Sequence, residues 1–203
     1  MRKTTKALII ISTIIIIDQI LKIWIKTNMM LGEEYQILGD WFIIHFTENN
    51  GMAFGIELWG KQGKVFLTLF RIVAVIGIGW YLRLLIKHNR PTGLIVSVSL
   101  IMAGAVGNII DSILYGMIFN GSYHQVAEFM PESGGYSSLF HGKVVDMFYF
   151  PVIKGYYPDW FPFNAGRQFI FFRPVFNIAD SAITIGVISI LVFQRKFFKH
   201  HTA

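Results

Sequence analysis

The sequence contains no cysteine and few charged residues, and both deficits narrow its possible functions. Without cysteine the chain has no internal disulfide, no thiolate nucleophile and no thiolate metal ligand. Only 15% of the 203 residues are charged, whereas 54% are hydrophobic and the mean hydropathy is +0.52. An ordinary soluble domain carries more charge and fewer apolar residues. The composition therefore predicts a small protein that crosses a membrane several times.

Four apolar segments are long enough to cross the hydrocarbon core, which takes about 20 helical residues. They cover residues 7–25, 64–86, 93–114 and 174–194. The N-terminus, the short link between the second and third segments, and the C-terminal tail hold nine of the 18 Lys and Arg residues and none of the 12 acids. The positive-inside rule then places both termini in the cytoplasm. We expect a mainly α-helical membrane protein with four transmembrane helices.

The first segment follows a basic start, so a cleaved signal peptide has to be considered. Its apolar stretch is about twice the usual length of a signal core, and no small-residue cleavage site follows it. Asp18 and Lys22 lie one helical turn apart, with the acid first, as helical ion pairs prefer. We expect a retained helix in which this pair faces protein.

Two long connections, residues 27–63 and 115–173, lie opposite the termini in this topology and are therefore extracytoplasmic. Residues 35–46 carry β-branched and aromatic side chains around a Gly-Asp turn, which predicts a short hairpin or small sheet. The second connection contains an aromatic cluster at residues 156–163, for which we favour an anchor in lipid headgroups over a substrate-binding platform. Because no internal repeat divides the chain, we expect a single domain over residues 1–203.

Acidic residues in or beside the apolar segments carry the strongest functional signal. In the expected topology Asp111 lies near the outer end of the third segment, and Asp180 lies near the outer start of the fourth. Asp146 lies in an apolar stretch that leads toward that start. An unpaired charge at the bilayer centre costs at least about 3 kcal/mol. Carboxyl groups retained together at one membrane boundary therefore suggest a pair that shares a proton and activates water.

Partner cations and helix ends offer a structural explanation for the same acids. We favour that explanation for Asp18, because Lys22 is a ready partner, and leave both interpretations open for Asp111. For Asp146 and Asp180 we favour a functional pair. The helix dipole favours the ionised form of Asp180, whereas apolar residues flank Asp146. We therefore expect Asp180 to act as the base and Asp146 to hold the proton.

Other chemistries have weaker support in the sequence. Ser137 and Ser138 have no motif that supplies a base, His124 and His141 lack metal-ligand spacing, and no phosphate-binding loop or basic nucleic-acid face is present. A proton-coupled transporter would distribute its acids across the depth of the bilayer. A membrane scaffold would give no reason for two Asp-bearing blocks. We expect an enzyme with no metal, no other cofactor and no nucleic-acid partner.

Four sequence blocks, in this order, resemble those of the bacterial lipoprotein signal peptidases, the aspartyl signal peptidase II family. They are Asp18-Gln-Ile-Leu-Lys22, Asn49-Asn-Gly-Met-Ala-Phe54, Gly107-Asn-Ile-Ile-Asp111 followed by Gly142-Lys-Val-Val-Asp146, and Phe176-Asn-Ile-Ala-Asp-Ser181. The resemblance implies that Asp146 and Asp180 are the catalytic pair. It also implies polar support of the site by Asn49, Asn108 and Asn177, and structural roles for Asp18, Lys22 and Asp111.

The resemblance also implies a substrate and a location. Family members cleave prolipoproteins before a cysteine that carries diacylglycerol, at the outer face of the bacterial cytoplasmic (inner) membrane, and cyclic peptides of the globomycin type block them. Family architecture adds a small extracytoplasmic β-sheet cradle and a mobile amphipathic helix over the site, which suits residues 32–62. We expect a monomer in contact with membrane lipid.

The chain departs from the family pattern in two respects. Ser112 stands where the family commonly has Arg directly after the Asp of the third block, and we expect Arg173 or Lys143 to supply the missing positive charge. The loops at residues 115–141 and 151–172 are also longer than in compact members, which predicts a lid or a partner surface. Neither departure removes a carboxyl group of the pair.

Overall fold

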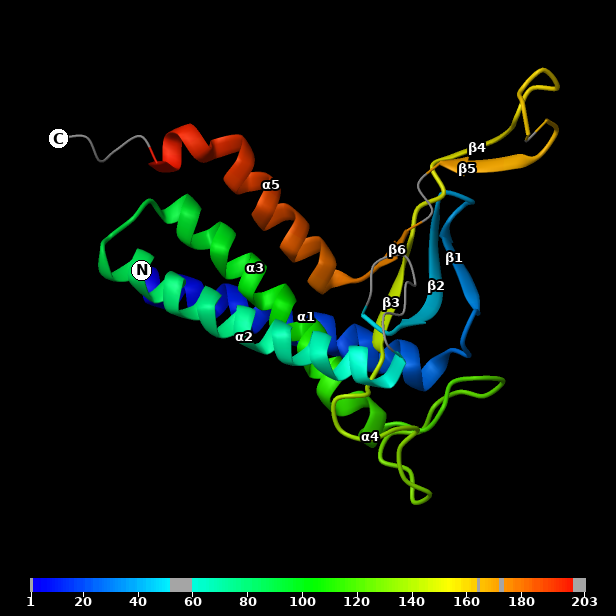
Figure 1. Ribbon diagram of the computed structural model, residues 1–203, viewed down its shortest axis with the longest axis horizontal. Helices are drawn as coiled ribbons and strands as arrows, with labels where there is room; N and C mark the ends of the chain where they lie inside the picture. The colour runs from blue at the N-terminus through cyan, green and yellow to red at the C-terminus, as the bar shows by residue number, and fades with distance from the viewer. Residues whose placement is uncertain (1, 52–59, 164, 172–173, 199–203) are drawn as a thin grey trace.

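The protein is a bundle of four long helices with a small β-sheet at one end (Figure 1). A computed structural model describes residues 2–51, 60–163, 165–171 and 174–198. The helices of the bundle are α1 (Lys3–Asn28), α2 (Gly60–Lys87), α3 (Thr92–Ile110) and α5 (Ile178–Phe198). The expectation of a mainly α-helical membrane protein with a small sheet is confirmed.

Three of the helical stretches are long and apolar enough to cross a membrane: Lys3–Asn28, Gln62–Lys87 and Thr92–Ile118. The third continues α3 through a π-helical segment, η2 (Asp111–Tyr115), and the short α4 (Gly116–Ile118). The fourth apolar helix, Ile178–Phe193, is shorter. It begins later than the predicted residue 174 because the chain first forms a strand and then a capping turn at Asn177.

Helix α3 lies at the centre of the bundle and packs against α1, α2 and α5. Glycines on α3 allow close approach, since a side chain at Gly104 would collide with the backbone of Ala179 in α5. One at Gly107 would lie 2.8 Å from the Asp18 carboxyl oxygen on α1. Side chains at the sheet end of α1 and α3 can therefore meet the start of α5.

The sheet joins segments that are far apart in the sequence. Its four strands are antiparallel in the order β1 (Glu34–Leu38), β2 (Phe42–Asn49), β3 (Val144–Tyr149) and β6 (Val175–Phe176). The predicted hairpin around Gly39-Asp40 is confirmed. Val145 and Met147 of β3 are buried in the same core as Ile25 of α1. Because side chains alternate along a strand, Asp146 lies on the opposite face of β3.

A second hairpin, β4 (Ile153–Tyr156) with β5 (Gln168–Phe171), projects away from the sheet (Figure 1). It carries the aromatic cluster predicted at residues 156–163. Trp160 is 79% exposed and Phe163 is 97% exposed. Such exposure suits a headgroup anchor and a substrate platform equally well, so the choice between them stays a prediction. The expected amphipathic helix falls largely on residues 52–59, outside the described residues.

Candidate active site

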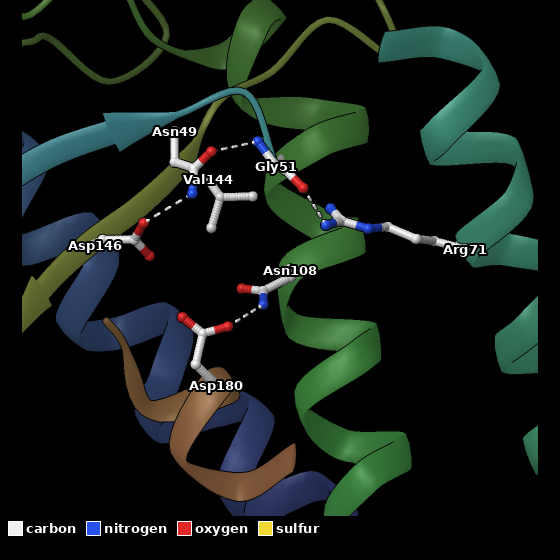
Figure 2. Close-up of a pocket in the computed structure, with 7 residues that line it drawn as sticks. All are labelled: Asn49, Gly51, Arg71, Asn108, Val144, Asp146 and Asp180. Atoms are coloured by element: carbon white, nitrogen blue, oxygen red, sulfur yellow. Dashed lines mark hydrogen bonds between the residues drawn. The ribbon is translucent and has the colours of Figure 1, made fainter. Parts of the chain in front are cut away.

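Asp146 and Asp180 line the same cavity, which has a volume of about 190 Å³ and lies at the sheet end of the bundle. Asp146 projects from β3, and Asp180 lies in the first turn of α5. Figure 2 shows both carboxyl groups turned toward the shared space. The other residues that line the cavity are Asn49, Gly51, Arg71, Asn108 and Val144. The structure therefore brings the two predicted carboxyls to one site.

Asn177, which precedes α5, is bonded to both acids. Its side-chain amide donates to Asp146 Oδ1 at 2.7 Å. Its Oδ1 accepts the backbone N–H of Asp180 at 2.9 Å, and its own backbone N–H donates to Asp180 Oδ2 at 3.3 Å. This reciprocal pattern caps the helix in the manner of a capping box. The buried Asn177 thus fixes the start of α5 and holds the two carboxyl groups in position relative to each other.

Two further asparagines contact the pair from other elements. Asn108 of α3 donates to Asp180 Oδ1 at 2.8 Å, and Asn49 of β2 donates to Asp146 Oδ2 at 3.4 Å. The amide of Asn108 is oriented in turn, because its Oδ1 accepts the Lys22 ammonium at 2.9 Å. All three asparagines predicted to support the site therefore bond to one or both of its carboxyls.

A buried ion cluster lies beneath the cavity and ties its elements together. Lys22 Nζ lies 2.9 Å from Asp18 Oδ2 and 2.7 Å from Asp111 Oδ2, which confirms the predicted Asp18–Lys22 pair. Asp18 accepts the backbone N–H of Ala179 in α5 at 2.9 Å, and Asp111 accepts that of Val145 in β3 at 3.4 Å. The cluster thus anchors both elements that carry the pair, which gives Asp111 a structural role.

The two carboxyls have different surroundings. Asp146 is 4% exposed, whereas Asp180 is half-buried. Burial, followed by the neighbouring charge of Asp180, raises the pKa of Asp146 to about 7, against the opposing effect of Lys22 and of its hydrogen bonds from Asn49 and Asn177. Asp146 can therefore carry a proton near neutral pH. Two carboxyls in unlike environments can divide the roles of acid and base.

The structure also shows a site residue that the sequence analysis overlooked. Arg71, in α2, lines the cavity, whereas Lys143 pairs with Glu48 at 3.2 Å and is not among the described residues that line it. Lys143 therefore lies outside this cavity, and Arg173 lies outside the described residues, so the expectation that one of the two supplies the missing positive charge stays a prediction. Ser112 is buried and donates to the Asn108 carbonyl at 2.9 Å. A lone arginine in an apolar run was the available signal for Arg71.

Metal ligation has no candidate in the described part of the chain, where no three His, Asp or Glu residues gather closely enough to hold an ion. The chemistry that the site can perform with its own groups is proton transfer between two carboxyls, aided by amide donors.

Replacement of Asn177 by alanine is expected to lower both stability and the activity of the pair. Loss of the helix cap costs about 1 kcal/mol, and Asp146 loses its shortest hydrogen bond. Thermal unfolding in detergent should show the first effect, and turnover should fall about 10- to 100-fold because the carboxyls lose their common support. Asn28→Ala, which removes an exposed amide from α1, is the matched control. Equal stability and turnover in the two variants would contradict this role for Asn177.

Comparison with known proteins places the chain in a family. A family model described as "Signal peptidase (SPase) II" matches residues 10–196. A lipoprotein signal peptidase of Porphyromonas gingivalis is 53% identical over 192 residues, which cover 94% of this chain and 82% of that protein. One of Amoebophilus asiaticus is 40% identical over 184 residues, covering 89% and 74% of the two chains.

Two solved structures share the overall fold. One described as a bacterial membrane enzyme superposes with a TM-score of 0.66 at 26% identity, covering 98% of this chain and 93% of the other. A second with the same description has a TM-score of 0.63 at 28% identity, covering 95% and 94% of the two chains. The ordered motifs, the membrane helices and the matched family model agree, and the chain belongs to the signal peptidase II family.

Proposed function

We propose that this protein removes signal peptides from diacylglyceryl-modified prolipoproteins by hydrolysing the bond before the lipidated cysteine, with Asp146 and Asp180 as the catalytic pair. The observation that carries the proposal is the single cavity lined by both carboxyls in a member of the signal peptidase II family. The names of the relatives, lipoprotein signal peptidases, support the substrate class.

The unlike environments of the pair support a division of roles. Ionised Asp180 takes a proton from a water molecule held between the carboxyls, and that water attacks the scissile carbonyl carbon. Protonated Asp146 donates a hydrogen bond to the carbonyl oxygen, and a proton returns to the leaving amine as the bond breaks. Hydrogen bonds from Asn108 and from the Asn177 backbone to the Asp180 oxygens suit a carboxylate, as does its place in the first turn of α5.

The position of the cavity suits a lipid-anchored substrate. It lies at the sheet end of the bundle, so acyl chains can stay in the bilayer while the polar peptide reaches the carboxyls. Basic residues and a lack of acids mark the opposite end, where α1 begins and α5 ends (Figure 1). By the positive-inside rule, that end faces the cytoplasm and the cavity faces outward across the cytoplasmic membrane. We propose a single-domain monomer that is blocked by globomycin-type cyclic peptides.

A cleavage assay with purified protein in detergent or lipid tests this function. The substrates are a prolipoprotein peptide that carries diacylglycerol on its cysteine and the same peptide without the lipid. We expect a single cut before the cysteine of the lipidated peptide and little or none in the other. If the lipidated peptide stays intact, or if both peptides are cut at equal rates, the proposal fails.

The proposed roles predict a fall in kcat/KM as the pH rises through about 7. Asp146 must hold its proton in the free enzyme, and burial together with the charge of Asp180 raises its pKa to about 7. The protonated form, and with it the activity, is therefore present below that pH and lost above it. The profile should be measured with the lipidated peptide in a mixed buffer of constant ionic strength. A kcat/KM that still increases between pH 7 and pH 9 would contradict the role of Asp146.

A further inference from the structure

Arg71 is the one cation among the described residues that line the cavity. It lies in α2, and its guanidinium donates from Nη2 to the carbonyl of Gly51. Gly51 has a φ of +85°, and a Cβ at that position would lie 2.7 Å from Arg71 Nη1. The guanidinium therefore contacts a position that favours glycine for two reasons: the backbone has a positive φ, and a side chain would collide with Arg71.

The turn that Arg71 holds is connected to Asp146. The backbone N–H of Gly51 donates to Asn49 Oδ1 at 2.7 Å, which fixes the side-chain amide of Asn49. The Nδ2 of that amide donates to Asp146 Oδ2 at 3.4 Å. A path of three hydrogen bonds thus runs from α2 to a carboxyl of the pair (Figure 2).

The charge of Arg71 also lies where it affects the pair. Figure 2 shows its side chain extending from α2 toward the cavity, across from Asp180. Arg71 interacts electrostatically with Asp180 and Asp146. The other cation acting on Asp146 is Lys22 of α1, which is already paired with Asp18 and Asp111. Arg71 is therefore the positive charge in this site that has no carboxylate ion-pair partner among the described residues.

The location of Arg71 in a membrane helix needs an explanation. A charged residue inside such a helix is unfavourable even on the lenient insertion scale. The flanking residues Phe70 and Val73 are largely exposed on the surface of α2, which packs mainly against α3. A hydrogen bond to the Gly51 carbonyl could be made by an uncharged donor. The positive charge of Arg71 is therefore explained by the carboxyls of Asp180 and Asp146, with which it interacts.

We propose that Arg71 is a positioning residue of the peptidase site. Its guanidinium fixes the Gly51 turn so that Asn49 holds Asp146, and its positive charge stabilises the ionised carboxylate of Asp180. This inference rests on the proposed function, since it assigns a role within the same site. It adds α2 to α1, α3, β2 and the start of α5, which already hold residues that orient the carboxyls. No residue of α2 other than Arg71 lines the cavity in the described part of the chain.

Kinetics of Arg71→Gln, Arg71→Lys and the control Arg83→Gln test this role with the lipidated peptide. Arg83 lies on the same helix, exposed and twelve residues nearer the basic end. For Arg71→Gln we expect kcat to fall about 10- to 100-fold with KM changed less than about threefold, because geometry at the carboxyls is lost rather than binding. Arg83→Gln should match the unmodified protein in both parameters.

The pH profile separates the two parts of the role. Loss of the positive charge in Arg71→Gln should move the acid limb of kcat/KM to higher pH. The cation that still faces the pair is then Lys22, whose charge is already balanced by Asp18 and Asp111. Arg71→Lys keeps the charge but lacks the planar fork, so its acid limb should stay in place while kcat is reduced. A merely structural arginine would leave the acid limb unchanged in both variants.

An Arg71→Gln variant with the kcat and acid limb of the unmodified protein would overturn the inference. The proposed function would survive that result, because the unmodified protein would still cleave the lipidated peptide in the same assay. If Arg71→Gln fails to fold, Arg71→Lys decides: reduced kcat with an unmoved acid limb and unchanged thermal stability supports the role, whereas unreduced kcat, or a loss of kcat that accompanies a loss of thermal stability, refutes it. Absence of cleavage by the unmodified protein would instead refute the function itself.

Discussion

Asp146→Asn and Asp180→Asn should each lower kcat/KM for the lipidated peptide by about 10³- to 10⁴-fold. Asparagine preserves the size of the side chain but can neither take a proton from water nor return one to the leaving amine. Both variants should stay folded, because the Lys22 cluster and the bundle core do not depend on the acidity of either group. Cleavage rates and thermal unfolding should be measured on the same preparations.

Asp159→Asn provides the matched control, since Asp159 is an exposed acid between β4 and β5 and lies outside the cavity lining. Its activity should equal that of the unmodified protein. The double variant Asp146→Asn/Asp180→Asn should be no worse than either single variant, because two groups that act in one step lose their effect together. Substantial cleavage by either single variant would exclude a two-carboxyl mechanism.

The largest loss of stability is expected from Lys22→Met, at about 3–5 kcal/mol. Lys22 is fully buried and contacts Asp18, Asp111 and Asn108. Its removal leaves two buried carboxylates without a cation, and the desolvation cost of each is then uncompensated. Any movement of these carboxylates toward water would also weaken the bonds by which Asp18 holds Ala179 of α5 and Asp111 holds Val145 of β3. Denaturant or thermal unfolding in detergent measures the change.

Two further variants show whether the charge imbalance is the cause. Lys87→Met removes an exposed lysine at the end of α2 and should leave stability within about 0.5 kcal/mol of the unmodified protein. The triple variant Asp18→Asn/Lys22→Met/Asp111→Asn removes all three charges and should recover much of the loss, because no carboxylate is left unpaired. A Lys22→Met protein as stable as the control would show that the cluster does not hold the elements together.

Local patterns in the sequence were sufficient to predict the membrane helices and to assign Asp146 and Asp180 to one site. Long apolar runs predict membrane helices, because a helix satisfies its own backbone hydrogen bonds in lipid. The spacing of Asp18 and Lys22 predicts their contact, because residues four apart share a helix face. Acids that lie at the same end of separate apolar segments must lie at a similar depth, so Asp146 and Asp180 could be assigned to one site.

Contacts between distant segments could not be predicted in the same way. The bonds from Ala179 and Val145 to Asp18 and Asp111 use backbone N–H groups, which every residue has, so no residue type marks them. Arg71 was overlooked because its position toward the cavity depends on the rotation of α2 against α3. The pairing of Lys143 with Glu48 could not be predicted for a related reason, since Glu48 lies on the neighbouring strand β2.

The central claim is that one proton is held by Asp146 and that its neighbour is ionised. Infrared titration of the protonated carboxyl band in Asp146→Asn and in Asp180→Asn, without substrate, tests it most directly. We predict that the band left in Asp180→Asn, which reports Asp146, persists to higher pH than the band left in Asp146→Asn. The reverse order, with the carboxyl of Asp180 protonated to the higher pH, would contradict the account.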